Sequence, residues 1–243
     1  MIEPLLLAAT RVSTFAQQQP LTTASGFFFA RASRLFLVTS RHVVIDEPSG
    51  HFPDRLEIDL HVDAGNVACA RAFSMPLYRG GRALWRQGND GAGNIDVAVL
   101  EIEHDALPDG LLYRAFTPAH LAVDPALVEV GASLLVAGCP LGFHDTLHHM
   151  PVVRHAVIAS SFGLRFQGQG YFLTDGRMHR GSSGSPVVLR RALGNPEAPD
   201  ALPWLLGVHS SRIDLGSRDQ AQDEALGLNC AWYADVLMAL TEG

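Results

Sequence analysis

The stretch that decides the fold is Gly181-Ser182-Ser183-Gly184-Ser185-Pro186, followed by Val187-Val188-Leu189. A serine between glycines is typical of a nucleophile held in a sharp turn. In an α/β-hydrolase that turn reads Gly-x-Ser-x-Gly and leads from a strand into a helix. Here Ser185 stands in place of the last glycine, and Pro186 with the β-branched run after it predicts a strand. The stretch therefore argues against an α/β-hydrolase.

Two residues earlier in the chain supply the groups that such a serine needs. We expect His42, in the stretch 37–43, and Asp96, in the stretch 94–100, each to lie in an apolar strand. A serine hydroxyl attacks efficiently only when a neutral imidazole takes its proton and a carboxylate orients that imidazole. An aspartate buried without a partner would cost several kcal/mol, and a positioned imidazole is a suitable partner. We therefore predict Ser183 as nucleophile, His42 as general base and acid, and Asp96 as the residue that orients His42.

These segments carry a family resemblance. The runs LVTSRHVV (37–44), DVAVL (96–100) and GSSGSP (181–186) resemble the chymotrypsin-like serine proteases. They are most similar to bacterial trypsin-like peptidases, near the HtrA-like and glutamyl endopeptidase-like protease domains, and no PDZ-like segment follows. The likeness covers nearly the whole chain. It implies one domain over 1–243 with two antiparallel β-barrels, the first to about residue 115 with His42 and Asp96, the second from about residue 116 with Ser183.

The pattern along the chain favours the same all-β fold. Short strand-like runs are bounded by Gly, Pro, Asp and Asn, as in sandwiches and barrels. The segment 105–125 has no strong strand signal and is predicted to cross between the barrels, and 233–240 is predicted to contain a short amphipathic helix. The predicted strands are 26–30, 35–38, 56–62, 95–102, 133–137, 152–159, 185–189 and 205–210.

Gly181 is predicted to shape an oxyanion hole. A glycine two residues before the nucleophile lets the backbone turn so that the N–H groups of Gly181 and Ser183 face the developing oxyanion. Each such donor contributes about 10²–10³ in kcat.

The resemblance also suggests residues that bind substrate. Ser210 would support Asp96 through its hydroxyl and bind the substrate backbone through its carbonyl. Arg177 matches the floor of the specificity pocket, which disfavours cleavage after Lys or Arg. His209 occupies the position of a histidine in glutamate-specific relatives, and Arg180 lies nearby in sequence. An acidic or amide P1 residue is one interpretation; a small apolar P1 residue, with His209 simply packed in its strand, is the other.

Composition limits the partners. The chain has 243 residues, 47% hydrophobic, and a formal net charge of −7, with 18 Lys and Arg that form no run. Nothing in it offers phosphates an electrostatic footprint, so we expect no nucleic-acid partner. Without a signal-peptide pattern or an apolar window of about 18 residues, the sequence predicts a cytoplasmic protein with no membrane contact. The odd count of three cysteines also suits a reducing compartment.

The loop Gly142-Phe143-His144-Asp145-Thr146-Leu147-His148-His149 concentrates histidines and an aspartate. It lacks zinc-like spacing, so we expect it to contact substrate and expect no metal or cofactor. The sequence predicts a serine endopeptidase that acts on proteins or peptides through an acyl-enzyme on Ser183. The alternative is a catalytically silent binding module of the same fold, or a protease gated by an activating partner. The oligomeric state stays open.

Overall fold

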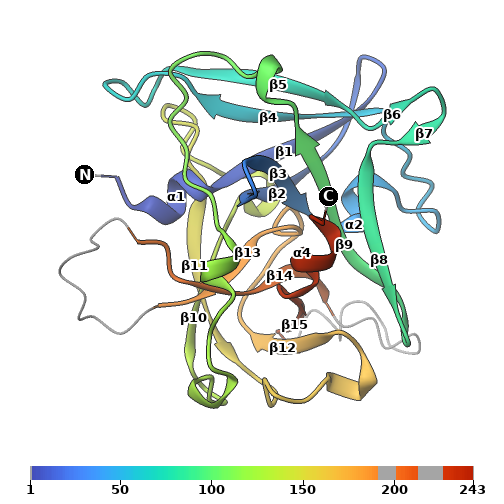
Figure 1. The fold of residues 1–243 in the computed structure, drawn as a ribbon, viewed down its shortest axis with the longest axis vertical. Coiled ribbons are helices and arrows are strands. Elements are labelled where there is room, and N and C mark those ends of the chain that lie inside the picture. The colour runs from blue at the N-terminus through green and yellow to red at the C-terminus, as the bar shows by residue number, and fades with distance from the viewer. Residues whose placement is uncertain (1, 191–200, 213–226, 243) are drawn as a thin grey trace.

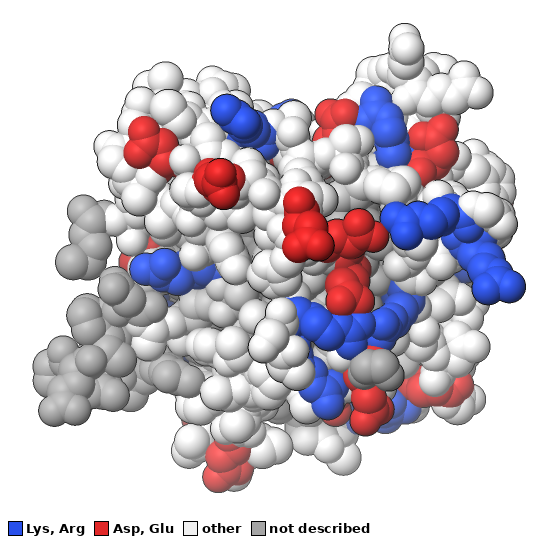
Figure 2. Space-filling view, turned by 45° about the horizontal axis from the view of Figure 1, so that its top comes forward, with Lys and Arg blue, Asp and Glu red and all other residues white. Residues whose placement is uncertain are grey.

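A computed structural model describes residues 2–190, 201–212 and 227–242, with backbone only at 211 and 212 (Figure 1). Strands dominate these residues and the helices are short, which confirms the predicted all-β class. No helix in the described part of the chain is long and apolar enough to cross a membrane. On the face shown in Figure 2, acidic and basic side chains lie among each other without a broad basic surface.

The N-terminal half is an antiparallel sheet in the order β5-β4-β1-β2-β3-β9-β8. The short helix α1 (Pro4–Ala8) precedes it, and the one-turn helix α2 (Arg41–Val44) follows β3. Its strands are β1 (Ala9–Ala16), β2 (Gln19–Arg31), β3 (Arg34–Thr39), β4 (Arg55–His61), β5 (Ala70–Pro76), β8 (Trp85–Asp90) and β9 (Gly93–Ile102), with a separate pair, β6 (Tyr78–Arg79) and β7 (Arg82–Ala83).

Two tight hairpins align the strands that lead to the predicted site. Between β2 and β3, Ala32 (φ 49°) and Ser33 (φ 66°) both adopt the left-handed conformation that a type I′ turn requires. Between β8 and β9, the Asp90 side chain accepts a hydrogen bond from the Ala92 N–H (2.9 Å). These turns set the registers of β2 with β3 and of β8 with β9, and β3 in turn pairs with β9, where Thr39 lies opposite Ala98.

The C-terminal half is a closed barrel in the order β10-β11-β12-β15-β14-β13, with β13 pairing back onto β10. Buried side chains from all its sides, Phe172 and Leu134 among them, fill its interior. After β15 the chain ends in the helix α4 (Val236–Leu240). The barrel strands are β10 (Ser133–Gly138), β11 (Val152–Ile158), β12 (Tyr171–Asp175), β13 (Pro186–Leu189), β14 (Trp204–Arg212) and β15 (Leu228–Tyr233).

A core shared between the halves holds them in a fixed relation. The Phe27 ring from β2 meets Phe116 of the crossing segment edge to face at 5.5 Å between ring centroids. Val97 from β9, Leu205 from β14 and Leu237 from α4 belong to the same buried cluster. The crossing segment carries only short 3₁₀ turns, η1 (His104–Ala106), η2 (Pro118–His120) and η3 (Pro125–Leu127). The predicted domain boundary near residue 115 stays a prediction.

All eight predicted runs lie on observed strands; seven of them differ from the observed ends by at most two residues, whereas the run 26–30 covers only the C-terminal part of β2, which begins at Gln19. The sequence reading missed β1, β5, the short pair β6 and β7, β8, β12 and β15, and the predicted C-terminal helix is confined to 236–240. One prediction about local structure was wrong: His42 does not lie in an apolar strand. The strand β3 ends at Thr39, and His42 sits in α2 directly after it.

Candidate active site

The position of His42 follows from the end of β3. This strand is buried along most of its length, so it carries the chain into the boundary between the two halves. There the Thr39 hydroxyl donates to the Ser25 carbonyl (2.8 Å), and the Ser40 hydroxyl donates to the His209 carbonyl (3.1 Å). These two bonds fix the start of α2, and with it the imidazole of His42.

Asp96 on β9 faces His42 and receives three hydrogen bonds. The His42 backbone N–H donates to Oδ1 (2.8 Å), and the His42 Nδ1 lies 2.7 Å from Oδ2. The Ser210 hydroxyl also donates to Oδ2. Because an ionised carboxylate only accepts, Nδ1 carries the proton and Nε2 is left with a free lone pair. This is the tautomer that a general base needs.

The interactions between His42 and Asp96 favour a protonated imidazole and an ionised carboxylate. Burial by itself lowers the pKa of His42, but the hydrogen bond and the charge of Asp96 outweigh burial and raise that pKa above its usual 6.5. Burial likewise raises the pKa of Asp96, whereas the contacts with His42 and Ser210 outweigh it and hold that pKa below its usual 3.8. The imidazole is therefore a stronger base than a free histidine.

Ser183 lies next to Ser210, and its hydroxyl forms a hydrogen bond with that residue rather than with His42. Its Oγ donates to the Ser210 carbonyl oxygen (3.1 Å). Among the hydrogen bonds of the described residues, none joins Ser183 to His42. Ser210 on β14 thus contacts both Asp96, through its hydroxyl, and Ser183, through its carbonyl.

The turn before Ser183 orients its backbone amides. Gly181 has φ +89°, and a Cβ there would lie 2.6 Å from the Cys139 carbonyl oxygen, so only glycine fits. The Arg180 carbonyl accepts from the Leu141 N–H (2.6 Å). Since the C=O and N–H of a trans peptide point in opposite directions, the Gly181 N–H points away from Leu141. Within the described residues, the N–H groups of Gly181 and Ser183 have no hydrogen-bond partner and are available to an anionic oxygen.

Ser25 is a residue at the site that sequence reasoning missed. Its fully buried hydroxyl accepts from the Cys139 N–H (2.9 Å) and donates to the Gly181 carbonyl (2.7 Å). Its backbone N–H donates to the Ser183 carbonyl (2.9 Å). The only sequence signal is a polar residue just before the apolar end of β2, which a motif search passes over. Ser25 ties the first sheet to the turn that carries Ser183.

The predicted specificity residues occupy different environments. His209 is buried, and its backbone bonds on both sides to the turn, with its N–H on the Ser185 carbonyl and its carbonyl on the Gly184 N–H (2.8 Å each). Arg177 and Arg180 are exposed, and their side chains make no hydrogen bond or ion pair with the rest of the described chain.

The histidine-rich loop is held by contacts of its own. The hydrogen bond from His148 holds the pKa of Asp145 down at about 2. The His148 carbonyl lies 2.7 Å from the His61 Nε2 at the end of β4. Across residues 2–190, 201–212 and 227–242, no group of three or more His, Cys, Asp or Glu side chains is arranged to hold a metal ion. The contact of Leu141 with Arg180 brings the preceding turn, η4 (Pro140–Gly142), beside the Ser183 turn.

Comparison with known families identifies the class. The trypsin-like peptidase domain matches residues 24–193, so the chain belongs to that family. No curated protein sequence matches the chain.

Solved structures show the same fold at low sequence identity. A serine endoprotease from Yersinia pestis is 15% identical with a TM-score of 0.56, over 97% of this chain and 62% of that chain. The active form of the Rv3671c protease from M. tuberculosis is 16% identical with a TM-score of 0.53, over 98% of this chain and 82% of that chain. Its inactive form is 15% identical with a TM-score of 0.51, over 98% and 91%.

Proposed function

We propose that the protein is a serine endopeptidase that hydrolyses peptide bonds through an acyl-enzyme on Ser183. The observation that carries the proposal is the convergence at Asp96, which holds His42 in the base tautomer and accepts from Ser210, whose carbonyl binds the Ser183 hydroxyl. Residues from both halves of the chain meet in that arrangement. Membership of the trypsin-like peptidase family supports the same assignment.

The chemistry follows the geometry. His42 Nε2 takes the proton of the Ser183 hydroxyl while Oγ attacks the carbonyl carbon, and the resulting oxyanion is stabilised by the N–H groups of Gly181 and Ser183. His42 then gives the proton to the leaving amine as the C–N bond breaks. His42 then takes a proton from a water molecule, whose oxygen attacks the ester carbonyl. His42 gives that proton to Ser183 Oγ as the acyl–oxygen bond breaks and the carboxylic acid product leaves.

In the resting arrangement the Ser183 hydroxyl must leave the Ser210 carbonyl before it can donate to His42. The same carbonyl is the acceptor we assign to the backbone N–H of the substrate residue before the scissile bond. Substrate binding would therefore compete with Ser183 for this oxygen and release the hydroxyl for attack.

We propose that P1 is Glu or Gln, or a small apolar residue. Buried His209, whose backbone borders the turn, would donate to an acidic or amide side chain in the first case and only pack in its strand in the second. Exposed Arg177 and Arg180 could add positive charge beside an acidic substrate. The protein would act on proteins or peptides in the cytoplasm, without a cofactor.

A second candidate function is a partner-gated or catalytically silent binding module. The observation that favours it is the bond from Ser183 to Ser210, which leaves the hydroxyl away from His42. An activating partner would then have to release it.

Peptide-library cleavage followed by mass spectrometry tests the proposal. We expect cleavage by the wild type and by Ser161→Ala, a matched change at an exposed serine, and none by Ser183→Ala. Enrichment of Glu or Gln before the cut would support a role of His209 in the pocket, and enrichment of small apolar residues would oppose it. Cleavage by Ser183→Ala at the wild-type rate would refute the assignment.

A further inference from the structure

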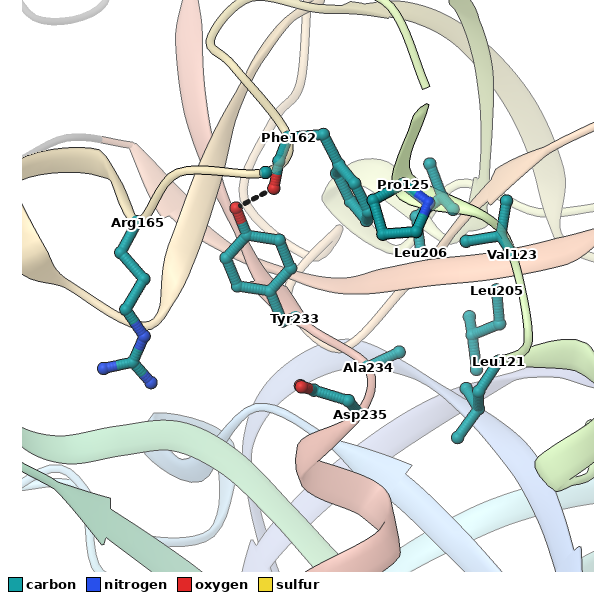
Figure 3. Close-up of a pocket in the computed structure, with 11 residues that line it drawn as sticks. Leu121, Val123, Pro125, Phe162, Arg165, Leu205, Leu206, Tyr233, Ala234 and Asp235 are labelled. Carbon is teal, nitrogen blue, oxygen red and sulfur yellow. Dashed lines mark hydrogen bonds between the residues drawn. The ribbon is translucent and has the colours of Figure 1, made fainter. Parts of the chain in front are cut away.

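A pocket of about 330 Å³ lies on a part of the molecule that the proposed chemistry does not use (Figure 3). It is bounded by the crossing segment, by the loop after β11, and by β14 and β15. Its volume is near the lower end of the ~300–1,000 Å³ typical of ligand sites. Its apolar walls are Leu121, Val123, Pro125, Phe162, Leu205 and Leu206.

The polar end of the pocket carries an excess of negative charge. Arg165 lines it, but its guanidinium is paired with Asp90 (2.9 Å). Asp235 is exposed and makes no ion pair with any described residue. Asp124, between the apolar lining residues Val123 and Pro125, is also exposed, and its carboxylate accepts from the Ala126 N–H (2.9 Å). A positively charged group would therefore find, beside an apolar cavity, the carboxylate of Asp235, which forms no ion pair within the described residues.

The wall between the two ends is built rigidly. The Tyr233 hydroxyl donates to the Phe162 carbonyl (2.6 Å) and more weakly to that of Leu164 (3.3 Å). Figure 3 shows Tyr233 between Arg165 on one side and the apolar residues on the other. The Tyr233 and Phe162 rings also pack edge to face at 5.2 Å between centroids. These contacts hold this wall of the pocket in place.

A second hollow of about 220 Å³ adjoins the pocket. The two share Arg165, Tyr233 and Asp235, and the second also reaches Ile95. Ile95 directly precedes Asp96 on β9. Leu205 and Leu206, at the other end, lie on the strand that carries Ser210. An occupant would therefore contact β9, which carries Asp96, and β14, which carries Ser210, without touching either residue.

We propose that this pocket is a docking site for a segment of a regulatory protein that carries a large aliphatic or aromatic side chain next to Lys or Arg. The apolar cavity would take the large side chain, and Asp235 would pair with the basic one. The assignment of binding is independent of the proposed function, whereas the regulatory effect rests on it.

Fluorescence anisotropy with two labelled, amidated peptides, GFLKRG and GFLEEG, tests the binding. The host is full-length Ser183→Ala, so that no peptide is cut. We expect the basic peptide to bind more tightly, and replacement of its Phe by Ala to weaken binding about tenfold. In the same host, Asp235→Asn should weaken the basic peptide about three- to fivefold at low salt, and the matched surface change Asp109→Asn should not. Equal binding of both peptides, or an equal effect of Asp109→Asn, would overturn the proposal.

The regulatory effect is measured by the rate at which a small fluorophosphonate labels otherwise wild-type protein. We expect saturating GFLKRG to change that rate at least twofold, and Asp235→Asn to remove the effect at the same peptide concentration. A rate that stays constant while the peptide is bound would overturn the regulatory assignment. Complete absence of labelling would contradict the proposed function instead, and the anisotropy result would still decide the binding.

Discussion

Replacing Asp96 by asparagine tests whether Asp96 acts by orienting the imidazole of His42 or only by filling space beside it. Asparagine keeps the size of the side chain, and its carbonyl oxygen can still accept from the His42 backbone N–H. Its NH₂ group then faces Nδ1, which must become the acceptor, so the proton moves to Nε2. A protonated Nε2 cannot take the proton of Ser183. In serine hydrolases of this geometry the wrong tautomer lowers kcat by about 10⁴, or about 5.4 kcal/mol at 1.36 kcal/mol per decade.

The pH profile provides a second readout of the same change. Activity needs neutral His42, and Asp96 raises the pKa of His42 above 6.5. The wild-type rate should therefore fall, as pH falls, with a midpoint above 6.5. In Asp96→Asn the effect of burial is no longer opposed by the hydrogen bond to a carboxylate and its charge, so the midpoint should move to lower pH.

The pH dependence of the free energy of unfolding provides a third readout of the interaction between His42 and Asp96. The raised pKa of His42 contributes stability that is complete below about 6.5 and is lost as pH rises through the folded value. The lowered pKa of Asp96 contributes stability that is present above about 3.9 and is lost as pH falls through the folded value. Urea unfolding should therefore show the largest deficit of Asp96→Asn between about pH 4 and 6.5.

The assay is hydrolysis of a peptide that the wild type cleaves, measured from pH 5 to 9. Asp46→Asn is the control, because the charge of Asp46 makes the smallest contribution to the raised pKa of His42; this change should lower the midpoint slightly without lowering the plateau. An Asp96→Asn enzyme within tenfold of wild type, or one whose midpoint moves to higher pH, would refute the reasoning.

Two further predictions concern stability and thiol chemistry. Gly184→Ala should destabilise the fold by about 2–5 kcal/mol in urea unfolding, because Gly184 has φ +85° and a Cβ would lie 2.1 Å from a carbonyl oxygen. Gly91→Ala, where a Cβ meets nothing, should stay within about 0.5 kcal/mol, and equal loss in both variants would contradict the account. A thiol reagent at pH 8 should label Cys69 quickly and the other two cysteines only after denaturation, because burial raises the pKa of Cys139 and of Cys230 to about 12. Rapid labelling of all three cysteines in the native protein would contradict this prediction, because it would require the surroundings of Cys139 and Cys230 to open to solvent.

Residues whose side chains need a specific partner when they are buried could be predicted from the sequence. Asp96 stands out because a carboxylate in an apolar strand needs a partner, and the structure supplies His42 and Ser210. Ser25 could not be found in this way. Its importance lies in three hydrogen bonds to segments more than a hundred residues away, and those distances appear only in the fold.

The strands that were missed have physical reasons as well. The edge strands β5 and β8 are mostly exposed or half-buried, so they show little apolar periodicity and are held by backbone pairing. In β15 the pattern is broken by Asn229, which is buried and is satisfied by donating to the Gly176 and Gly227 carbonyls (2.8 and 2.9 Å). Sequence patterns report burial, whereas these elements depend on hydrogen bonds.

The most direct test of the central claim is the location of a covalent adduct. The protein is incubated with a fluorophosphonate at pH 8, its intact mass is measured, and a proteolytic digest is mapped. We predict one adduct per chain on Ser183, absent in Ser183→Ala and formed far more slowly in His42→Ala. Labelling of another residue, or an equal rate in His42→Ala, would contradict the proposal that His42 activates Ser183.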